Sequence, residues 1–204
     1  MMNRNYKYRN FFQVIFLIAI AGCSSMSSVT TIANTALEIV GVQKPEVPEL
    51  PDIQKPPRTI QVNLHAGDNL NVDENGHSLA LVTKIYKLRQ NAAFQQTSYE
   101  TFLNPQKEKE ILGADLLEVK EIILIPGQRF HVEEKVSREA YFIGVVALFR
   151  SPASQRWRAT FPAEDAEKTG ITVGMHACAL SIGIGLATNS EPRKTASISS
   201  VRCP

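Results

Sequence analysis

The sequence predicts a mainly all-β protein, a two-sheet β-sandwich of seven to eight strands with a small added helical segment. Two observations support this fold class. Short alternating or continuous apolar segments recur between residues 59 and 203, and turn residues such as Pro126-Gly127 separate them. In addition, the strand segments have the short length and frequent turns that are typical of sandwiches.

The first expected strand begins at Thr59, where Ile60, Val62 and Leu64 alternate with polar residues. The later strands are expected over residues 79–88, 117–125, 129–136, 141–149, 156–161, 171–186 and 195–203. Pro126-Gly127 suits the centre of a type II turn, so the third and fourth strands are expected to form a hairpin. Residues 141–149 are apolar throughout, which predicts burial on both faces, and residues 171–186 are interrupted by glycines, which predicts a bend.

The helical segment is expected between residues 91 and 113. Asn104 can cap a helix, Pro105 fits its first position and Gly113 can end it. The charged run 107–110 is interpreted as the solvated face of that helix. Residues 91–103 are expected to be helical as well, with three side chains turned to the core: Phe94, Phe102 and Leu103.

Residues 1–22 are expected to be a lipoprotein signal peptide. Basic residues precede an apolar run over 11–21, which is shorter than the roughly 20 residues needed to span a membrane. The run ends in Ile20-Ala21-Gly22-Cys23, which resembles a bacterial lipobox, so Cys23 is the predicted lipidation site. The alternative is an ordinary secretory signal, or a buried apolar N-terminus, that happens to contain a cysteine.

Residues 23–57 are expected to be the lipidated N-terminus and a proline-rich tether, followed by the β-sandwich domain over residues 58–204. Dense prolines disfavour helices and central strands and favour an extended chain. They stand at Pro45, Pro48, Pro51, Pro56 and Pro57. Residues 29–40 have the apolar spacing of a short helix, and this possibility stays open.

The charge balance argues against a basic surface for binding nucleic acid. The signal contains three basic and no acidic residues, so its removal makes a chain of net charge +2 slightly negative. No small-molecule substrate is expected either.

Cys178 and Cys203 are the cysteines that remain after Cys23, and an exported chain meets an oxidising compartment. We therefore expect them to form a disulfide, which would stabilise the domain by roughly 3 kcal/mol on the chain-entropy model. Two free thiols are the alternative, and a metal site is disfavoured because no ligand pair has suitable spacing.

The motifs of enzymes and cofactor sites are absent. No Gly-x-Ser-x-Gly elbow occurs, and Gly183 and Gly185 lack the third glycine of a dinucleotide loop. Residues 71–76 faintly resemble a calcium loop, but Val82 stands where the bidentate glutamate belongs. The sequence therefore predicts no enzyme, no cofactor and no metal site.

The segment over residues 66–78, AGDNLNVDENGHS, is the most unusual feature of the domain. It joins two strands with thirteen residues, whereas hairpin loops commonly have two to five. Long loops within compact domains tend to be functional. Leu70 and Val72 are apolar residues among polar ones, and we expect them near the tip. A plain connector is the alternative.

Several motifs together resemble the outer-membrane lipoprotein of type VI secretion systems, the TssJ (SciN/VasD) family. They are the lipobox, LHAGDNLNVDENGHSLALVTKIYKL over residues 64–88, YFIGVVALFR over 141–150 and RWRATF over 156–161. The family's pattern of a loop, a strand with a tyrosine and an apolar strand before a tryptophan resembles this chain at Asn71, Asp73, Gly76, Val82, Ile85, Tyr86, Leu88, Val145, Ala147, Phe149, Arg150 and Trp157.

The resemblance implies a transthyretin-like sandwich, a non-enzymatic role and a lipid anchor on the periplasmic face of the outer membrane. The implied partner is the periplasmic C-terminal domain of TssM, an inner-membrane protein, within the TssJ–TssL–TssM membrane complex. The family's loop after the first strand contacts that partner, which here corresponds to Gly67, Asp68, Asn69, Leu70, Asn71, Val72, Asp73 and Glu74. Leu70 and Val72 are expected to enter a pocket of TssM, inside a polar rim.

Two other classes of function remain open at this point. A lipid-anchored carrier of a small hydrophobic ligand would have a dry cavity between its sheets, whereas an assembly protein would have a filled core. An anchored hydrolase is disfavoured because no nucleophile with an acid/base partner is evident.

The Cys23→Ser variant should accumulate as an unprocessed precursor or disappear from outer-membrane fractions, because serine offers no thiol for the diacylglycerol. Metabolic labelling with palmitate and membrane fractionation measure this. If the variant incorporates palmitate as well as the wild type does, the predicted anchor is wrong.

Overall fold

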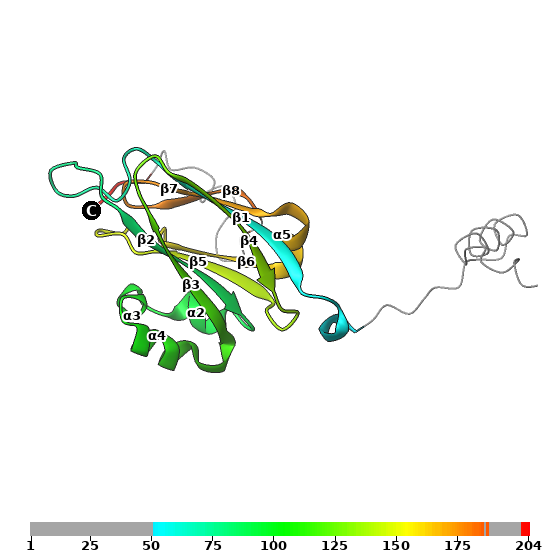
Figure 1. Cartoon of the computed structure of the whole chain (residues 1–204). Helices are drawn as coiled ribbons and strands as arrows, with labels where there is room; N and C mark the ends of the chain where they lie inside the picture. Colours follow the sequence, from blue (N-terminus) through cyan, green and yellow to red (C-terminus); the bar gives the residue numbers. More distant parts are fainter. Residues whose placement is uncertain (1–50, 186, 188–200) are drawn as a thin grey trace, which may run out of the picture. The chain divides into compact units, whose positions relative to one another are not determined.

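The computed structural model describes residues 51–185, 187 and 201–204. These residues form two four-stranded sheets packed face to face (Figure 1), which confirms the predicted fold class. The first sheet has the order β4-β1-β7-β8 and the second has the order β3-β2-β5-β6. The strands are β1 Arg58–Ala66, β2 Leu81–Leu88, β3 Leu116–Leu124, β4 Arg129–Val136, β5 Phe142–Ala147, β6 Arg158–Pro162, β7 Ile171–Met175 and β8 Leu180–Ile184.

Strand β1 follows the predicted alternation. Ile60, Val62 and Leu64 are completely buried between the sheets, while Gln61 and His65 are exposed on the outer face. β1 pairs with β4 in antiparallel and with β7 in parallel orientation, so it is a central strand of the first sheet. Because successive side chains of a strand point to opposite faces, every second residue of β1 lies in the core.

Strands β2 and β5 are buried on both faces, which confirms the prediction for residues 142–147, whereas Tyr141 just before β5 is 52% exposed. The second sheet can be apolar on its outer side because three short helices cover it (Figure 1): α2 Ala92–Gln96, α3 Tyr99–Phe102 and α4 Pro105–Leu112. A 3-10 turn, η2 over Gly113–Asp115, leads from α4 into β3. The Asn104 side chain accepts hydrogen bonds from the backbone N–H groups of Gln106 and Lys107, which confirms the predicted cap.

An aromatic cluster fixes these helices to the sheet. Tyr86 of β2 lies edge-to-face with Phe94 and Phe102, at ring-centroid distances of 5.1 and 5.9 Å. Gly144 of β5 makes room for the cluster, since a Cβ atom there would lie 2.8 Å from the Phe94 ring. Phe94 and Phe102 are buried as predicted, but the prediction for Leu103 is wrong: it is 55% exposed, because the chain leaves α3 there and turns into α4.

A buried ion pair connects α4 to β2. The Lys84 ammonium lies 2.6 Å from a Glu108 carboxylate oxygen, and the two side chains are only 6% and 4% exposed. Lys84 also donates to the carbonyl of Phe102 at 3.0 Å. Glu108 was expected on a solvated face, and this is wrong because the helical period places it on the same side as the buried Leu112, four residues later.

The expected hairpin of residues 117–136 is also wrong. The turn at Pro126-Gly127 forms, with Gly127 at φ +75°, but β3 belongs to the second sheet and β4 to the first. Side chains connect the two edge strands instead, since Lys120 of β3 lies 2.7 Å from Glu134 of β4. Burial alone would raise the pKa of Glu134, but hydrogen bonds from Lys120 and Lys87 outweigh burial and lower it.

The C-terminal part of the domain differs from the prediction in two places. Residues 171–186 do not form one bent strand, because β7 and β8 make an antiparallel hairpin with a turn between them. A helix that was not predicted, α5 Ala163–Thr169, joins β6 to β7 and packs on β1. The expected strand over residues 195–203 falls outside the described residues as far as residue 200, and residues 201–203 are not in a strand.

Lys84→Ala should lower the free energy of unfolding by about 3–5 kcal/mol, because it leaves the Glu108 carboxylate buried without its partner. Lys109→Ala, on the exposed face of α4, is the control and should change stability by no more than about 0.5 kcal/mol. Urea unfolding followed by circular dichroism measures both. Equal stability of the two variants would contradict a structural role for the pair.

Candidate functional site

The long loop, residues 67–80, crosses from the first sheet to the second, because β1 and β2 are consecutive in sequence but lie in different sheets. It lies against the turn between β7 and β8. The N–H groups of Gly67, Asn71 and Val72 donate to three successive carbonyls in that region, those of Met175, His176 and Ala177, at 2.8 to 3.1 Å. The loop therefore has a defined backbone path along a neighbouring turn.

Leu70 anchors this loop in the core. Its side chain has 0% exposure, and the carbonyl of Leu70 accepts the N–H of Leu79 at 2.9 Å, which brings the end of the loop back to its beginning. The expectation that Leu70 offers an apolar side chain at the tip is therefore wrong. Val72 is half-buried, so it too is only partly available to a partner.

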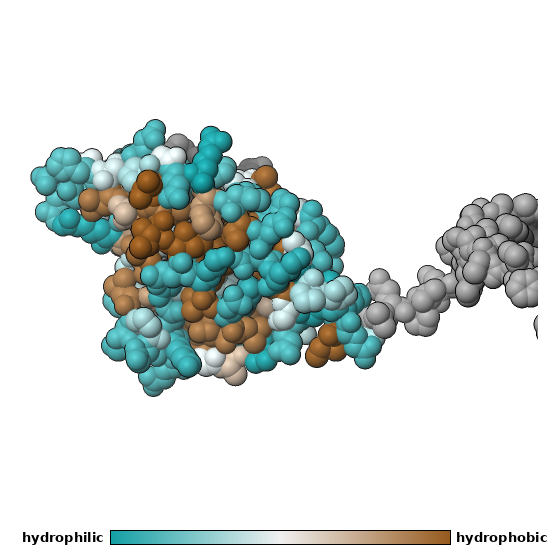
Figure 2. All heavy atoms as spheres, in the orientation of Figure 1, coloured by the Kyte–Doolittle hydropathy of each residue, from teal (hydrophilic) through white to brown (hydrophobic). Residues whose placement is uncertain are grey.

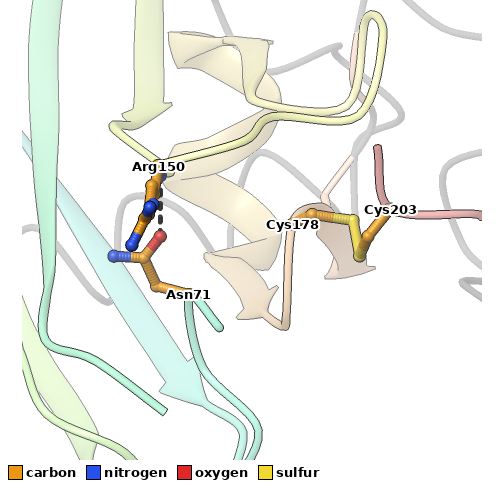
Figure 3. The surroundings of a disulfide bond; sticks show 4 residues. All are labelled: Asn71, Arg150, Cys178 and Cys203. Atoms are coloured by element: carbon orange, nitrogen blue, oxygen red, sulfur yellow. Dashed lines mark hydrogen bonds between the residues drawn. A yellow bond between two sulfur atoms is a disulfide. The ribbon is translucent and has the colours of Figure 1, made fainter. Parts of the chain in front are cut away.

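Asn71 connects the loop to two other segments. Its side-chain oxygen accepts the N–H of Arg150 at 2.8 Å (Figure 3), and its side-chain nitrogen donates to the carbonyl of Ala80 at 2.8 Å. Its φ of +46° lies in the left-handed region, which asparagine tolerates better than most residues. Asn71 thus holds the two ends of the loop and the chain after β5 together.

The tip of the loop is organised around Asp73. Its carboxylate accepts the N–H groups of Asn75 and His77, both at 2.8 Å, and faces the His77 ring at 3.2 Å. The backbone hydrogen bond from His77 is the main reason that the pKa of Asp73 is held below its ordinary value of 3.8. The ionised carboxylate therefore stabilises the tip above that pH, and this contribution is lost as the pH falls through the lowered pKa.

The surface of the loop is polar. Asp68, Asn69 and Glu74 are exposed, and Glu74 forms an ion pair with Arg150. Of the eight predicted contact residues, these three face solvent, Gly67, Val72 and Asp73 are half-buried, and Leu70 and Asn71 are buried. In Figure 2 the end of the domain that carries the loop is mainly hydrophilic.

A disulfide between Cys178 and Cys203, with Cα atoms 5.6 Å apart, ties the end of the chain to the same end of the sandwich (Figure 3). The carbonyl of Cys178 accepts the N–H of Ala153, from the connection between β5 and β6, at 2.9 Å. Three segments therefore meet at this end: the long loop, the β5–β6 connection and the β7–β8 turn. Arg150, Ala153 and His176 were not expected in this site, because each comes from a segment remote in sequence.

Within residues 51–185, 187 and 201–204, no group of three or more histidine, cysteine, aspartate or glutamate side chains is placed to hold a metal ion. Among the residues that the structure describes, no helix combines the length and the apolarity that a membrane span requires. A polar hollow of about 440 Å³ lies beside the loop on the outer face of the first sheet, between Asp68, Arg129 and His176.

Comparison with known protein families decides the assignment. Residues 58–178 match the model of the family described as "Type VI secretion lipoprotein, VasD, EvfM, TssJ, VC_A0113". The chain belongs to this family. The match begins at β1, includes the whole long loop and ends at Cys178 of the disulfide. It confirms the resemblance found in the sequence.

Solved structures agree with the family. The lipoprotein TssJ1 from Pseudomonas aeruginosa is 26% identical, with a TM-score of 0.57, over 67% of this chain and 100% of that one. A chain of a structure described as "Type VI membrane complex" is 25% identical, with a TM-score of 0.57, over 62% and 98%. A comparison with curated proteins finds no match.

Two further structures share the fold. A chain of the structure described as "T6SS protein TssM C-terminal domain (869-1107) from EAEC" has a TM-score of 0.55 and 23% identity over 62% of this chain and 98% of that one. Serratia marcescens Lip, a membrane-bound component of the type VI secretion system, has a TM-score of 0.56 and 19% identity over 62% and 96%.

Asn71→Ala should destabilise the domain by about 2–4 kcal/mol, because it removes two hydrogen bonds of a buried side chain and puts alanine at a positive φ. Thermal and urea unfolding measure the effect. Asn75→Ala at the exposed tip is the control, with an expected change below about 0.5 kcal/mol. If Asn71→Ala is as stable as this control, Asn71 does not hold the loop.

Proposed function

We propose that this chain is the outer-membrane anchor of a type VI secretion membrane complex, and that it binds the periplasmic C-terminal domain of TssM. The lipid on Cys23 would hold the chain in the outer membrane, and the folded domain would hold TssM from the periplasmic side. The role is a structural one in an assembly and requires no catalysis, cofactor or small-molecule substrate.

The observation that carries the proposal is the long loop, which is tied to the fold by hydrogen bonds and a buried side chain although most of its surface is exposed. Its backbone is bonded to the β7–β8 turn, Leu70 is buried, and the side-chain nitrogen and oxygen of Asn71 each form a hydrogen bond. A loop ordered before binding loses less entropy when it meets a partner than a flexible loop does. Asp68, Asn69 and Glu74 lie on its exposed surface, where they can contact TssM.

The comparisons support this partner. The family is that of a type VI secretion lipoprotein, and chains of this fold occur in structures described as the type VI membrane complex and as the TssM C-terminal domain. The long loop lies inside the region that matches the family model.

Two exposed apolar side chains next to the loop could be buried against a partner, whereas the tip of the loop is polar. Ile123 and Ile125, on and just after β3, are 63% and 58% exposed, and Leu124 between them pairs with Leu81 at the end of the loop. Figure 2 shows apolar atoms gathered on this side of the domain. Interfaces combine such apolar anchors with a polar rim, so the loop and these two side chains together form the proposed TssM surface.

The carrier alternative gains no support from the described residues. Side chains of both sheets, among them Leu64, Ile85 and Val145, are buried in one common core cluster. The hollow beside the loop lies on the outer face of the first sheet and is lined largely by polar residues and glycines, which does not suit a hydrophobic ligand.

The double variant Asp68→Lys/Glu74→Lys should bind the purified TssM C-terminal domain at least tenfold more weakly, which corresponds to about 1.4 kcal/mol. Reversing two charges within a contact surface removes its electrostatic complementarity to the partner. Both side chains are exposed and the ion pair of Glu74 with Arg150 lies on the surface, so the stability of the domain should change by no more than about 1 kcal/mol. Isothermal calorimetry and thermal unfolding measure the two effects.

Glu110→Lys/Glu133→Lys is the matched control, because it makes the same change in charge at exposed positions on α4 and β4. It should bind TssM like the wild type. The proposed surface is wrong if both double variants keep wild-type affinity or if both lose affinity equally, and the proposed partner is wrong if the wild type does not bind.

A further inference from the structure

The residues just before β1 are docked on the folded domain. Residues 51–57 belong to the same compact unit as the sandwich. They contain a 3-10 turn, η1 Asp52–Gln54, in which the N–H of Gln54 donates to the carbonyl of Pro51 at 2.8 Å and the N–H of Lys55 to that of Asp52 at 3.1 Å. The composition of this stretch predicts a free extended tether, so its contacts need a physical cause.

The first cause is Arg58, the first residue of β1. Its side chain is only 4% exposed, and its guanidinium donates to a carboxylate oxygen of Asp52 at 2.8 Å. The Nε atom lies 3.4 Å from a carboxylate oxygen of Glu167 on α5. A buried guanidinium requires negative partners, and one of the two comes from the segment before β1.

The second cause is Arg138, in the connection between β4 and β5. Its Nε donates to the carbonyl of Pro56 at 2.7 Å. Both of its terminal nitrogens donate to the Glu167 carboxylate, at 3.1 and 3.3 Å. This forked arrangement is the strong form of an arginine–carboxylate pair, and it fixes the guanidinium whose Nε holds the proline segment.

These contacts form one network of two arginines and two acids. Asp52 comes from the segment before β1, Arg58 from β1, Arg138 from the β4–β5 connection and Glu167 from α5. Isolated surface ion pairs contribute little to stability, but here both arginine side chains are largely buried and share the same carboxylate. The network therefore holds residues 51–57 against three other parts of the fold.

We propose that residues 51–57 form a docked strap, and that this network fixes the point at which the N-terminal chain leaves the domain. That point lies at the end of β1 opposite the long loop (Figure 1). Nine residues of β1 separate the two, which corresponds to about 30 Å at 3.3 Å per residue. On the proposed function, the strap would place the start of the N-terminal segment at the end of the domain opposite the TssM-binding loop.

Hydrogen exchange of the full chain, purified from membranes, tests the strap. The amides of Gln54 and Lys55 should exchange at least tenfold more slowly than in an unstructured peptide. Arg138→Gln/Glu167→Gln should abolish this protection while the amides of Val62 and Leu64 in β1 stay protected. Asp52→Asn, at a half-exposed residue of the strap, should weaken the protection of Gln54 and Lys55 and leave the β1 amides protected.

Lys109→Gln/Glu110→Gln is the matched control, because it removes one positive and one negative charge at exposed positions on α4, which contributes no residue to the network. Protection of the strap should remain in this control. The strap proposal is overturned if the wild-type amides of Gln54 and Lys55 exchange as in an unstructured peptide. It is equally overturned if the control loses protection as the Arg138→Gln/Glu167→Gln variant does.

The directional consequence is tested separately, since it rests on the proposed function. The Arg138→Gln/Glu167→Gln variant should bind the TssM C-terminal domain in solution like the wild type, but type VI secretion by cells that produce it should fall. Normal secretion with a released strap would overturn the directional role. Failure of the wild type to bind TssM would overturn the proposed function and leave the strap itself standing.

Discussion

The two hydrogen bonds of the Asn71 side chain determine how this domain presents its long loop. β1 and β2 follow one another in sequence but lie in different sheets, so the chain must cross the end of the sandwich. Asn71 bonds the far end of the loop, at Ala80, and the chain after β5, at Arg150, from a backbone conformation with positive φ. Leu70 is buried beneath this crossing, so the loop is anchored in the core at its base and polar at its surface.

Other parts of the chain support this end of the sandwich. The β7–β8 turn accepts the backbone hydrogen bonds of the loop, and the disulfide from Cys178 to Cys203 ties the C-terminus beside it. At the other end of β1, Arg58 and Arg138 bind the segment that precedes the strand, through Asp52 and the carbonyl of Pro56. On this account the function depends on the separation of two ends, one for the anchor and one for the partner, and the sandwich between them keeps that separation constant.

Local rules in the sequence predicted the elements well where the cause is local. The alternation at Ile60, the cap at Asn104 and the turn at Gly127 each follow from the chemistry of a few neighbouring residues. The strand with which a given strand pairs is not determined by local sequence. The sequences of β3 and β4 are compatible with a hairpin, and equally with edge strands in two different sheets, which is what the structure shows. The burial of Leu70 was missed for the same reason, since it depends on segments that pack on it from elsewhere. The burial of Glu108 follows the local helical period, but its partner Lys84 comes from β2, which the local pattern does not show.

Site-specific photo-crosslinking in cells with an active type VI machine tests the central claim most directly. A photoreactive amino acid at Glu74, on the tip of the loop, should give a covalent adduct with TssM. The same amino acid at Glu110, on the exposed side of α4, should give none. A TssM adduct from Glu110 without one from Glu74, in cells that secrete normally, would contradict the account.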